Sequence, residues 1–425
     1  MRIERLGDLG SAPLVLDLLA AATTRLGLPA PAALIGEWFG SQAIIAPSLQ
    51  TTEVDADAVF DPTPGGPHPT LGIGGASPIG GGWFGYLSYP DAGADGLGPR
   101  IPRAAGGWSD SVLRRDRDGT WWYENLLGAA ISPWIVDALQ TAPVPRSAVV
   151  VWTEADQAAH QRGVLACLEA IAAGEVYQAC VCTQFSGRLD GDPIDFFIEA
   201  VTRTAPARAA YVAGAWGAVA SLSPELFLRR CGEAVTSSPI KGTLPAHADP
   251  ARLRASVKDV AENIMIVDLV RNDLGRIART GTVSVRELLA VRPAPGVWHL
   301  VSSVSARVAA EMPMTAVLDA TFPPASVTGT PKTRARELLT GWEPRRRGVY
   351  CGTVGLASPV AGCELNVAIR TVEFTTDRTA TLGVGGGITA DSVPAREWDE
   401  CLHKATPIIG HATVGPQSRA RRTAS

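Results

Sequence analysis

The stretch SSPIKGTLPA, residues 237–246, places one lysine, Lys241, between an apolar strand-like run and a Gly-Thr turn. A lysine at a strand end usually lies on the surface, with its stem on apolar neighbours and its ammonium in water. A lysine held in a closed site can instead lose its proton and act as a nucleophile. Lys241 alone is consistent with both interpretations, so its surroundings have to decide between them.

Two other segments each carry a pair of acids three positions apart. The pairs are Asp259 with Glu262 in KDVAENIMIVDLVRND, and Glu397 with Glu400 in REWDECLHKA. In a helix this spacing puts both carboxylates on one face. Two such helices facing each other can hold a hard cation such as Mg2+ through oxygen ligands and leave positions open for a substrate. For either helix alone, a solvated acidic face is the more common case.

The glycines of LGVGGGITADS, residues 382–392, lie between an expected strand and an expected helix that Ser392 can cap and Pro394 can begin. Backbone amides in such a loop can hold a carboxylate or a phosphate. The segment does not match the dinucleotide fingerprint, because Ile388 stands where the last glycine is required. The chain also contains no G-x-x-x-x-G-K-[ST], no G-x-S-x-G and no H-E-x-x-H.

Two more basic residues are candidates for a site. In CELNVAIRTVEF, apolar residues alternate with small or polar ones, so Arg370 is expected to share a strand face with Asn366. An arginine there can clamp a carboxylate through two hydrogen bonds, although a solvent-facing arginine is more common. His299, in GVWHLVSS, is likewise more often a packed strand histidine than a catalytic one.

These candidates lie in the more regular part of the chain, after the connection TAPVPRS at 141–147. Before it, the chain is rich in Gly and Pro, with strand-like runs at 80–89 and 120–127. Further strands are predicted at 175–187, 208–221, 225–237, 281–291, 297–308, 348–358, 363–375 and 378–385. Helices are predicted at 153–174, with Thr153 as the cap, and at 192–204, 255–271, 313–321, 331–341 and 392–406. Because strands outnumber helices and often follow one another, the pattern predicts an α+β fold with large antiparallel sheets.

Composition narrows the class of protein. The 425 residues are 46% hydrophobic, enough for a substantial core, and the formal net charge is -4. No global positive field therefore draws the chain to nucleic acid or to an anionic membrane. Seven cysteines without a C-x-x-C fit reduced thiols better than a disulfide framework or a zinc site. The N-terminus carries Asp8, Asp17 and Arg25, so it lacks the apolar centre of a signal peptide, and we expect a cytoplasmic location.

Several segments, taken in order, carry a resemblance to a known family. They are SLSPELFLRR, SSPIKGTLPA, AENIMIVDLVRNDLGRIA, VWHLVSSV, FPPASVTGTPKTRA, RRGVYCGTVG, ELNVAIRT and LGVGGGITADSVPAREWDECLHKA. Together they resemble the chorismate-utilizing enzymes, which include anthranilate synthase component I, isochorismate and salicylate synthases, and aminodeoxychorismate synthase component I. The resemblance covers residues 150–408 and extends weakly to GGWFGYLSY.

The resemblance implies a fold and a domain organisation. The family fold is an α/β sandwich of two large antiparallel sheets with helices outside, and its site lies between the sheets. We expect residues 1–145 to form an N-terminal subdomain of this sandwich and residues 146–410 to form the chorismate-binding catalytic core. Residues 411–425 are polar and basic, and we expect a disordered tail.

The resemblance also implies roles for individual residues. Glu262 and Glu400 are similar to the ligands of a Mg2+ ion that holds the ring carboxylate of chorismate, and Asp259 and Glu397 are similar to their supporting carboxylates. The residues that match the family's substrate-binding set are Thr243, Tyr350, Arg370, Lys404, Gln178 and the amides of Gly385 and Gly387. Glu225 matches the general acid that protonates the departing ring hydroxyl, and His299 matches the histidine near the leaving group.

Two positions separate the members of the family. Isochorismate and salicylate synthases carry a water-activating lysine where this chain has Gln178, which has no basic nitrogen. Anthranilate synthases typically have alanine in the segment that here contains Lys241, which leaves room for ammonia to attack ring C2. A lysine there resembles aminodeoxychorismate synthase. The resemblance therefore implies that Lys241, once neutral, adds to C2 while Glu225 protonates the C4 hydroxyl, and that ammonia then attacks C4 and displaces the lysine.

The chain has no G-x-C-x-G nucleophile turn, so the resemblance implies that a separate glutamine amidotransferase supplies ammonia for 4-aminobenzoate and folate synthesis. Anthranilate synthesis is the main alternative, and a catalytically silent binding paralogue is an alternative of another class. Joint retention of Glu225, Lys241 and the metal-binding glutamates disfavours a silent paralogue. Three residues depart from the family pattern, namely Cys180, Ala246 and His403, where asparagine, arginine and asparagine are usual.

Overall fold

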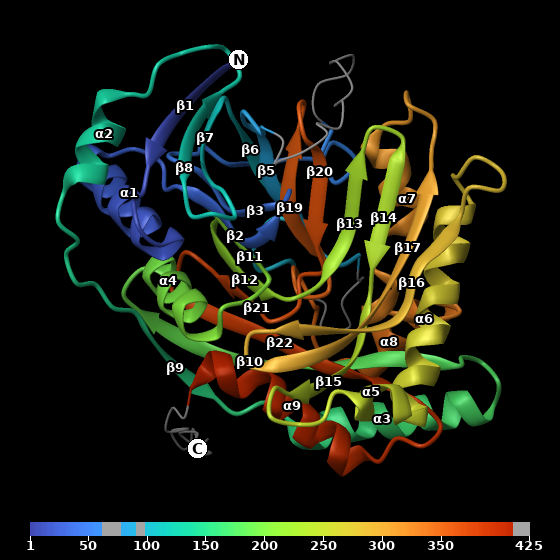
Figure 1. Cartoon of the computed structure of the whole chain (residues 1–425). Helices are drawn as coiled ribbons and strands as arrows, with labels where there is room; N and C mark the ends of the chain where they lie inside the picture. The colour runs from blue at the N-terminus through green and yellow to red at the C-terminus, as the bar shows by residue number, and fades with distance from the viewer. Residues whose placement is uncertain (62–77, 91–97, 411–425) are drawn as a thin grey trace, which may run out of the picture.

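The computed structural model describes residues 1–61, 78–90 and 98–410. Within these residues the strands form a 12-stranded and a 10-stranded sheet, and all paired strands are antiparallel. Figure 1 shows β13, β14, β19 and β20 upright, with β10 and β22 running across the view below them. The predicted class, an α+β fold with two large antiparallel sheets and outer helices, is confirmed.

The first sheet holds strands from both ends of the chain. In spatial order these are β1 Arg2–Gly7, β8 Trp121–Asn125, β7 Ser111–Arg115, β3 Ser41–Ala46, β2 Ala32–Trp38, β11 Arg208–Gly214, β12 Gly217–Ser223, β21 Thr371–Phe374, β22 Thr379–Ile388, β10 Gln178–Asp190 and β18 Gly329–Thr330, with β9 Val149–Thr153 also paired to β10.

The second sheet is ordered β15 Ile240–Pro245, β17 Val297–Arg307, β14 Ala234–Ser238, β13 Leu226–Cys231, β20 Gly362–Asn366, β19 Thr353–Ser358, β5 Gly82–Leu87, β6 Ala104–Ser109 and β4 Thr52–Glu53, with β16 Ser284–Ala294 also paired to β17. N-terminal strands thus sit inside both sheets, since β2 pairs with β11 and β5 pairs with β19. The division at residue 145 stays a prediction, and the expected tail at 411–425 lies outside the described residues.

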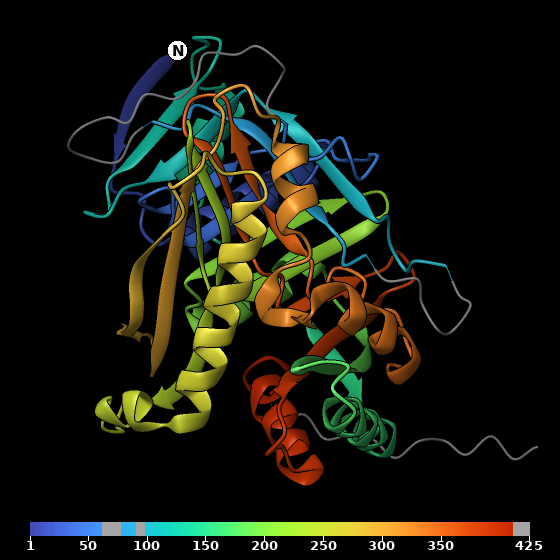
Figure 2. The ribbon, with the colours of Figure 1, turned by 90° about the vertical axis from the view of Figure 1, so that its right-hand side faces the viewer.

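The described helices are α1 Ala12–Leu26, α2 Pro133–Gln140, α3 Gln157–Ala172, α4 Pro193–Thr204, α5 Ala251–Ala255, α6 Val257–Gly275, α7 Met314–Thr321, η1 Ala325–Val327, α8 Lys332–Trp342 and α9 Pro394–Ile409. Helices α1 and α4 cover the first sheet, and α6 packs on β15, β16 and β17 of the second. Figure 2 shows α3 and α9 side by side at the foot of the molecule. Among the described residues, no helix combines the length and the apolar character needed to cross a membrane.

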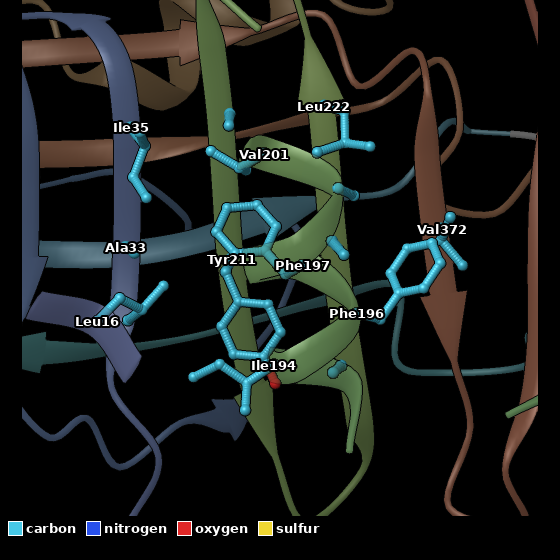
Figure 3. Packing of buried hydrophobic residues seen from close by; sticks show 14 of the residues in the cluster. Leu16, Ala33, Ile35, Ile194, Phe196, Phe197, Val201, Tyr211, Leu222 and Val372 are labelled. Carbon is cyan, nitrogen blue, oxygen red and sulfur yellow. The ribbon is translucent and has the colours of Figure 1, made fainter. Parts of the chain in front are cut away.

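The alternation of side chains along β2 explains why its sheet is covered on both faces. Ala33 and Ile35 join the core beneath α1 and α4, which Figure 3 shows with Phe197 and Tyr211. The intervening Leu34 points into a second core between the sheets. A strand buried on both faces has to be apolar at consecutive positions, because successive side chains point to opposite faces.

Several predicted strands are hairpins. The run at 208–221 divides into β11 and β12 at a turn that ends with Gly217, whose φ is +127°, and the run at 225–237 divides into β13 and β14. The prediction was wrong there because both arms of each hairpin are apolar and the turns are short. The run at 348–358 is a strand only from Thr353, whereas the predicted helix at 255–271 is confirmed as α6, which begins at Val257 and runs on to Gly275.

The predicted strand at 363–375 is also wrong, and the error concerns the site. The chain leaves the second sheet at the end of β20 and enters the first sheet at β21. Between them, Arg370 has a φ of +52°, so it does not lie in a strand and does not share a strand face with Asn366. The apolar alternation runs through this crossing, which is why a periodic pattern cannot show it.

Three further differences between the prediction and the structure concern helices. Thr153 ends β9 and donates its hydroxyl to Ser186 O, while Asp156 caps α3 by accepting from Ala159 N. Ser392 does not cap α9, whose N-cap is Val393. The helix α1 was missed, although its cap Ser11 and its terminal Gly27 are ordinary helix signals.

Candidate active site

The end of β22 is the strand segment around which the predicted groups gather. Cys180 and Cys182 of β10 donate their N–H groups to acceptors outside β22. Bonded and non-bonded pairs alternate in an antiparallel ladder, so the opposite residues, Gly387 and Gly385, turn their peptide groups away from β10. On the side of β22 that faces away from β10, the neighbouring strand β21 pairs only with residues 380–382. The peptide groups of Gly385 and Gly387 therefore lie beyond the part of β22 that pairs with β21.

Lys404, on α9, contacts this open edge. Its Nζ donates to Gly385 O over 2.7 Å and lies 2.7 Å from Glu400 Oε1. Burial opposes the charged amine, but the nearby carboxylate outweighs it and raises the pKa of Lys404 to about 12. Lys404 is thus a permanent cation beside the glycine edge.

Three side chains from different elements converge over Gly387. A Cβ at this position would lie 3.3 Å from Gln178 Oε1, 3.5 Å from Lys241 Nζ and 3.6 Å from Glu262 Oε2. The absence of a side chain on Gly387 leaves space among these polar atoms. Gln178 comes from β10, Lys241 from β15 and Glu262 from α6, so both sheets contribute to the site.

Lys241 points into this space rather than away from the protein. It is half-buried in β15, and its Nζ donates to Ser326 O over 3.1 Å. Gln178 is 2% exposed, and within the described residues its buried Oε1 has no hydrogen-bond partner. An unsatisfied buried acceptor is costly, so Gln178 Oε1 is available to a donor that enters the site.

Glu225 lies at the junction of β12 and β13, and it is 3% exposed. Its carboxylate accepts from Ile240 N at 3.4 Å, and the hydroxyl of Ser326 lies nearby. Burial raises the pKa of Glu225, although Ser326 and the charge of Lys241 oppose the change. A carboxyl group whose protonated form is favoured is suited to donate a proton.

His299, on β17, lies next to the lysine strand. Its Nδ1 and Thr243 Oγ1 are 2.9 Å apart, in the register of the β15–β17 pair. Burial, helped by the charge of Arg370, lowers the pKa of His299 to about 4. The imidazole is therefore neutral at pH 7, and its other ring nitrogen, Nε2, is not engaged by Thr243. Arg370 reaches this neighbourhood from the crossing between the sheets, not from a strand.

The four predicted carboxylates come from α6 and α9. A Cβ at Gly386 would lie 3.2 Å from Glu397 Oε2 and 3.5 Å from Glu400 Oε1, on the strand face opposite to Glu262. Lys258 Nζ bridges the two helices, 3.3 Å from Glu397 Oε1 and 3.9 Å from Glu262 Oε1. Lys258 thus links α6 and α9 near the end of β22. Asp259, the fourth carboxylate, lies against Gly242 in the turn of the lysine segment.

The donor set fits a hard cation. Burial raises the pKa of Glu262 although the charges of Lys241 and Lys258 lower it, and the neighbouring Glu400 and Asp259 add to the rise. Glu397 Oε2 is buried and unpartnered within the described part of the chain. In that same part, no group of three His, Cys, Asp or Glu side chains is already arranged to hold a metal ion. The metal roles of Glu262 and Glu400 stay predictions.

Tyr350 occupies the interior beside β22. Its ring lies where a Cβ on Gly383 would be, and its hydroxyl is 3.9 Å from Cys182 Sγ. Burial raises the pKa of Tyr350 well above its ordinary value, so the phenol stays protonated. Of the residues that depart from the family pattern, Cys180 is buried opposite Gly387, whereas Ala246 and His403 are exposed.

Two contributors to the site were not predicted as functional. Ser326 lies in the quoted segment FPPASVTGTPKTRA, and Lys258 is the first basic residue of α6. Their sequence signals were a position inside a family motif and an i, i+4 spacing from Glu262. Neither signal indicates which residues of other elements they contact.

Comparison with known proteins identifies the fold and the family of the chain. The structure of anthranilate synthase component I from Streptococcus pneumoniae superposes with a TM-score of 0.68 at 24% identity, covering 90% of each chain, which shows the shared fold. The chorismate binding enzyme family matches residues 55–410. The chain belongs to this family of chorismate binding enzymes.

Curated relatives are similar over a shorter region. Aminodeoxychorismate synthase component 1 from Klebsiella aerogenes is 40% identical over 248 residues, which is 56% of this chain and 54% of that protein. Anthranilate synthase component 1 from Streptomyces coelicolor is 36% identical over 249 residues, 57% of this chain and 48% of that protein. The matched region spans about half the length of these relatives.

Proposed function

We propose that this chain is component I of an aminodeoxychorismate synthase, which converts chorismate and ammonia to 4-amino-4-deoxychorismate and water. The observation that carries the proposal is the position of Lys241 Nζ, 3.5 Å from where a Cβ on Gly387 would lie and beside Gln178. A lysine in this position can be a nucleophile at the substrate ring, whereas an alanine could not. The 40% identity with the Klebsiella aerogenes component 1 supports the same assignment.

The proposed reaction has two displacements. The neutral amine of Lys241 forms a bond to ring C2, the ring double bond shifts, and the C4 hydroxyl leaves as water with a proton from Glu225. Ammonia then bonds to C4, the double bond shifts back and the C2–lysine bond breaks. The net change replaces the C4 hydroxyl by an amino group and leaves the enolpyruvyl ether intact.

The remaining groups have holding roles in this proposal. The N–H groups of Gly385 and Gly387, together with Lys404, Arg370, Thr243 and Tyr350, bind the carboxylates and orient the ring. His299, neutral and held by Thr243, faces the leaving hydroxyl as a hydrogen-bonding partner. Gln178 lacks a basic nitrogen, so no side chain at its position activates water as the nucleophile.

Magnesium is the proposed cofactor, with Glu262 and Glu400 as ligands and Asp259 and Glu397 in support. Bound Mg2+ would supply positive charge for the ring carboxylate of chorismate. We further propose that a glutamine amidotransferase subunit supplies the ammonia and that the product serves 4-aminobenzoate and folate synthesis.

Anthranilate synthesis is the second candidate, favoured by the 36% identity with the Streptomyces coelicolor protein. Purified protein would be incubated with chorismate, Mg2+ and excess ammonium, with and without added aminodeoxychorismate lyase, and the products separated. We expect 4-aminobenzoate only in the sample with lyase. Anthranilate in both samples would replace the proposal by the second candidate. No turnover and no Mg2+-dependent chorismate binding would indicate a silent paralogue.

Lys241→Ala gives the decisive variant of this assay. Loss of the nucleophile should lower aminodeoxychorismate formation by roughly a thousandfold or more. Lys258→Ala, which removes another lysine beside Glu262 and Glu397, serves as the comparison for a change of local charge. Full product formation by Lys241→Ala, with no trappable adduct in the wild-type protein, would contradict the covalent route.

A further inference from the structure

Ser326, the central residue of η1, contacts both proposed reacting side chains. Its carbonyl oxygen accepts from Lys241 Nζ over 3.1 Å, and its hydroxyl lies near enough to the Glu225 carboxylate to lower the pKa of that group. The position of η1 therefore sets the separation between the amine and the acid. A displacement of about 1 Å in such a pair can cost on the order of a hundredfold in rate.

A buried arginine holds η1 from one side. Arg347 is 1% exposed, and its Nη1 donates to Val327 O over 2.7 Å, one residue from Ser326. Its Nη2 donates to Cys180 O over 2.6 Å, on the strand that pairs with the glycine edge. One planar guanidinium thus fixes the spacing between η1 and β10.

Glu343 neutralises this arginine and extends the same connection. Its two oxygens lie 2.8 Å from Arg347 Nε and 2.6 Å from Nη2, and Oε1 also accepts from Cys182 N over 3.0 Å. The guanidinium lies 4.4 Å from the centre of the Tyr89 ring. Replacing a buried ion pair by apolar residues is often neutral for stability or even stabilising, so stability alone does not require this pair beside the site.

A second, partly buried cation holds the segment just before η1. Lys332 Nζ donates to Thr321 O and Pro323 O, each over 2.9 Å, and to Asp273 Oδ2 over 2.6 Å. Asp273 lies on α6, the helix that also carries Glu262. The segment from Thr321 to Val327 is therefore held at one end by the partly buried Lys332 and at the other by the buried Arg347.

We propose that the Arg347–Glu343 pair positions the reacting groups: it holds η1 against β10 so that Ser326 keeps Lys241 and Glu225 aligned. This inference rests on the roles proposed above for Lys241 and Glu225. Arg347 and Glu343 are positioning residues, because they contact Val327, Cys180 and Cys182 rather than the substrate space.

The test is the double variant Arg347→Met with Glu343→Gln. It removes both charges of the pair together, and the glutamine can still accept from Cys182 N. We expect a folded protein whose kcat falls roughly 10- to 100-fold, while the KM for chorismate changes by less than about threefold because the carboxylate-binding groups are untouched. Arg347→Lys keeps the charge but loses the fork that reaches both carbonyls, so it should also lower kcat.

A matched control lies at the far end of the first sheet. Arg114 and Glu124, on β7 and β8, form a buried pair in which Glu124 also accepts backbone N–H groups, from Ile79 and Gly80. Arg114→Met with Glu124→Gln removes a similar ion pair far from the site. We expect it to leave kcat unchanged below its melting temperature.

Ser326→Ala tests the same alignment without touching the ion pair. Because the serine hydroxyl lowers the pKa of Glu225, its loss should move the alkaline limb of the pH–rate profile to higher pH. A wild-type kcat in the Arg347/Glu343 double variant would overturn the proposal, as would an unchanged profile in Ser326→Ala. So would a loss of activity that tracks only the unfolded fraction. Rates are followed as chorismate consumed and products are identified, so failure of the proposed function, seen as an anthranilate product, is distinguished from failure of this inference, seen as a wild-type kcat in the double variant.

Discussion

The surroundings of Glu225 and His299 shift the pKa values of these two side chains in opposite directions. Burial raises the pKa of Glu225 and favours the protonated carboxyl, whereas burial and Arg370 lower the pKa of His299. Within one site, the surroundings therefore favour the protonated form of the carboxyl and the unprotonated, neutral form of the imidazole. The neutral imidazole accepts or donates a hydrogen bond but adds no charge beside Arg370.

His299 should titrate near pH 4 in the folded protein, when the ring nitrogens are followed by NMR. An unfolded histidine has a pKa of about 6.5, so between pH 6.5 and 4 the unfolded chain binds more protons. The contribution of His299 to stability is thus complete above pH 6.5 and is lost as the pH falls towards 4. The loss should reach about 3 kcal/mol, read as the difference between wild type and His299→Gln in urea unfolding.

The exposed His247 provides the control for this titration. His247→Gln should leave the pH dependence of unfolding as it is in the wild type. A His299 resonance that titrates near pH 6.5 would contradict the burial of the imidazole against Thr243 and Arg370.

At the scale of the element, the glycines of β22 matter because they leave room for groups from other elements. Gly383, Gly385 and Gly387 share one face of the strand, and their missing side chains admit Tyr350, Cys182 and the polar space, respectively. Glycine usually weakens a strand because it packs no side chain. Here the close approach of other groups explains three glycines on one face.

Two substitutions on that face separate stability from binding. Gly383→Ala would overlap the Tyr350 ring, so we expect a loss of about 1–3 kcal/mol in unfolding free energy. Gly387→Ala brings no contact shorter than 3.3 Å, so the fold should persist, but the methyl fills the space shared by Lys241 and Gln178. Calorimetric titration should show chorismate affinity reduced by about tenfold or more. Wild-type affinity in Gly387→Ala would mean that substrate binds elsewhere.

At the scale of the whole molecule, the site exists because distant elements meet at one strand end. The helices α6 and α9 are separated by more than a hundred residues in sequence, yet Lys258 of α6 contacts Glu397 of α9. The lysine strand belongs to the second sheet, and the glycine strand belongs to the first. A magnesium ion and a chorismate molecule held by these residues would link elements of the two sheets.

Magnesium binding should therefore depend on both helices. We expect Glu262→Gln and Glu400→Gln each to abolish measurable Mg2+ binding in the presence of chorismate, and Glu397→Gln to weaken it roughly 10- to 100-fold. Isothermal titration gives these affinities without turnover. The exposed Asp268→Asn on α6 is the control and should bind as the wild type does. Tight binding by Glu262→Gln would remove α6 from the metal site.

The sequence predicted the fold class and most of the elements. Alternation and helix caps located strands such as β17 and helices such as α7 within a few residues, because these signals are local. Alternation could not show where β20 passes from one sheet to the other, since the apolar pattern runs on through Arg370. It also merged the hairpins, whose turns are short.

Residue types and motif order determined the candidate groups, from Lys241 and Glu225 to the glutamates of α6 and α9. Only the tertiary structure decided which atoms meet: Lys241 with Ser326 O, Lys258 with two helices, and Arg347 with η1 and β10. The reason is physical. Spacing along a chain specifies which residues share a face, whereas burial, charge pairing and the register between strands depend on segments that meet only after folding.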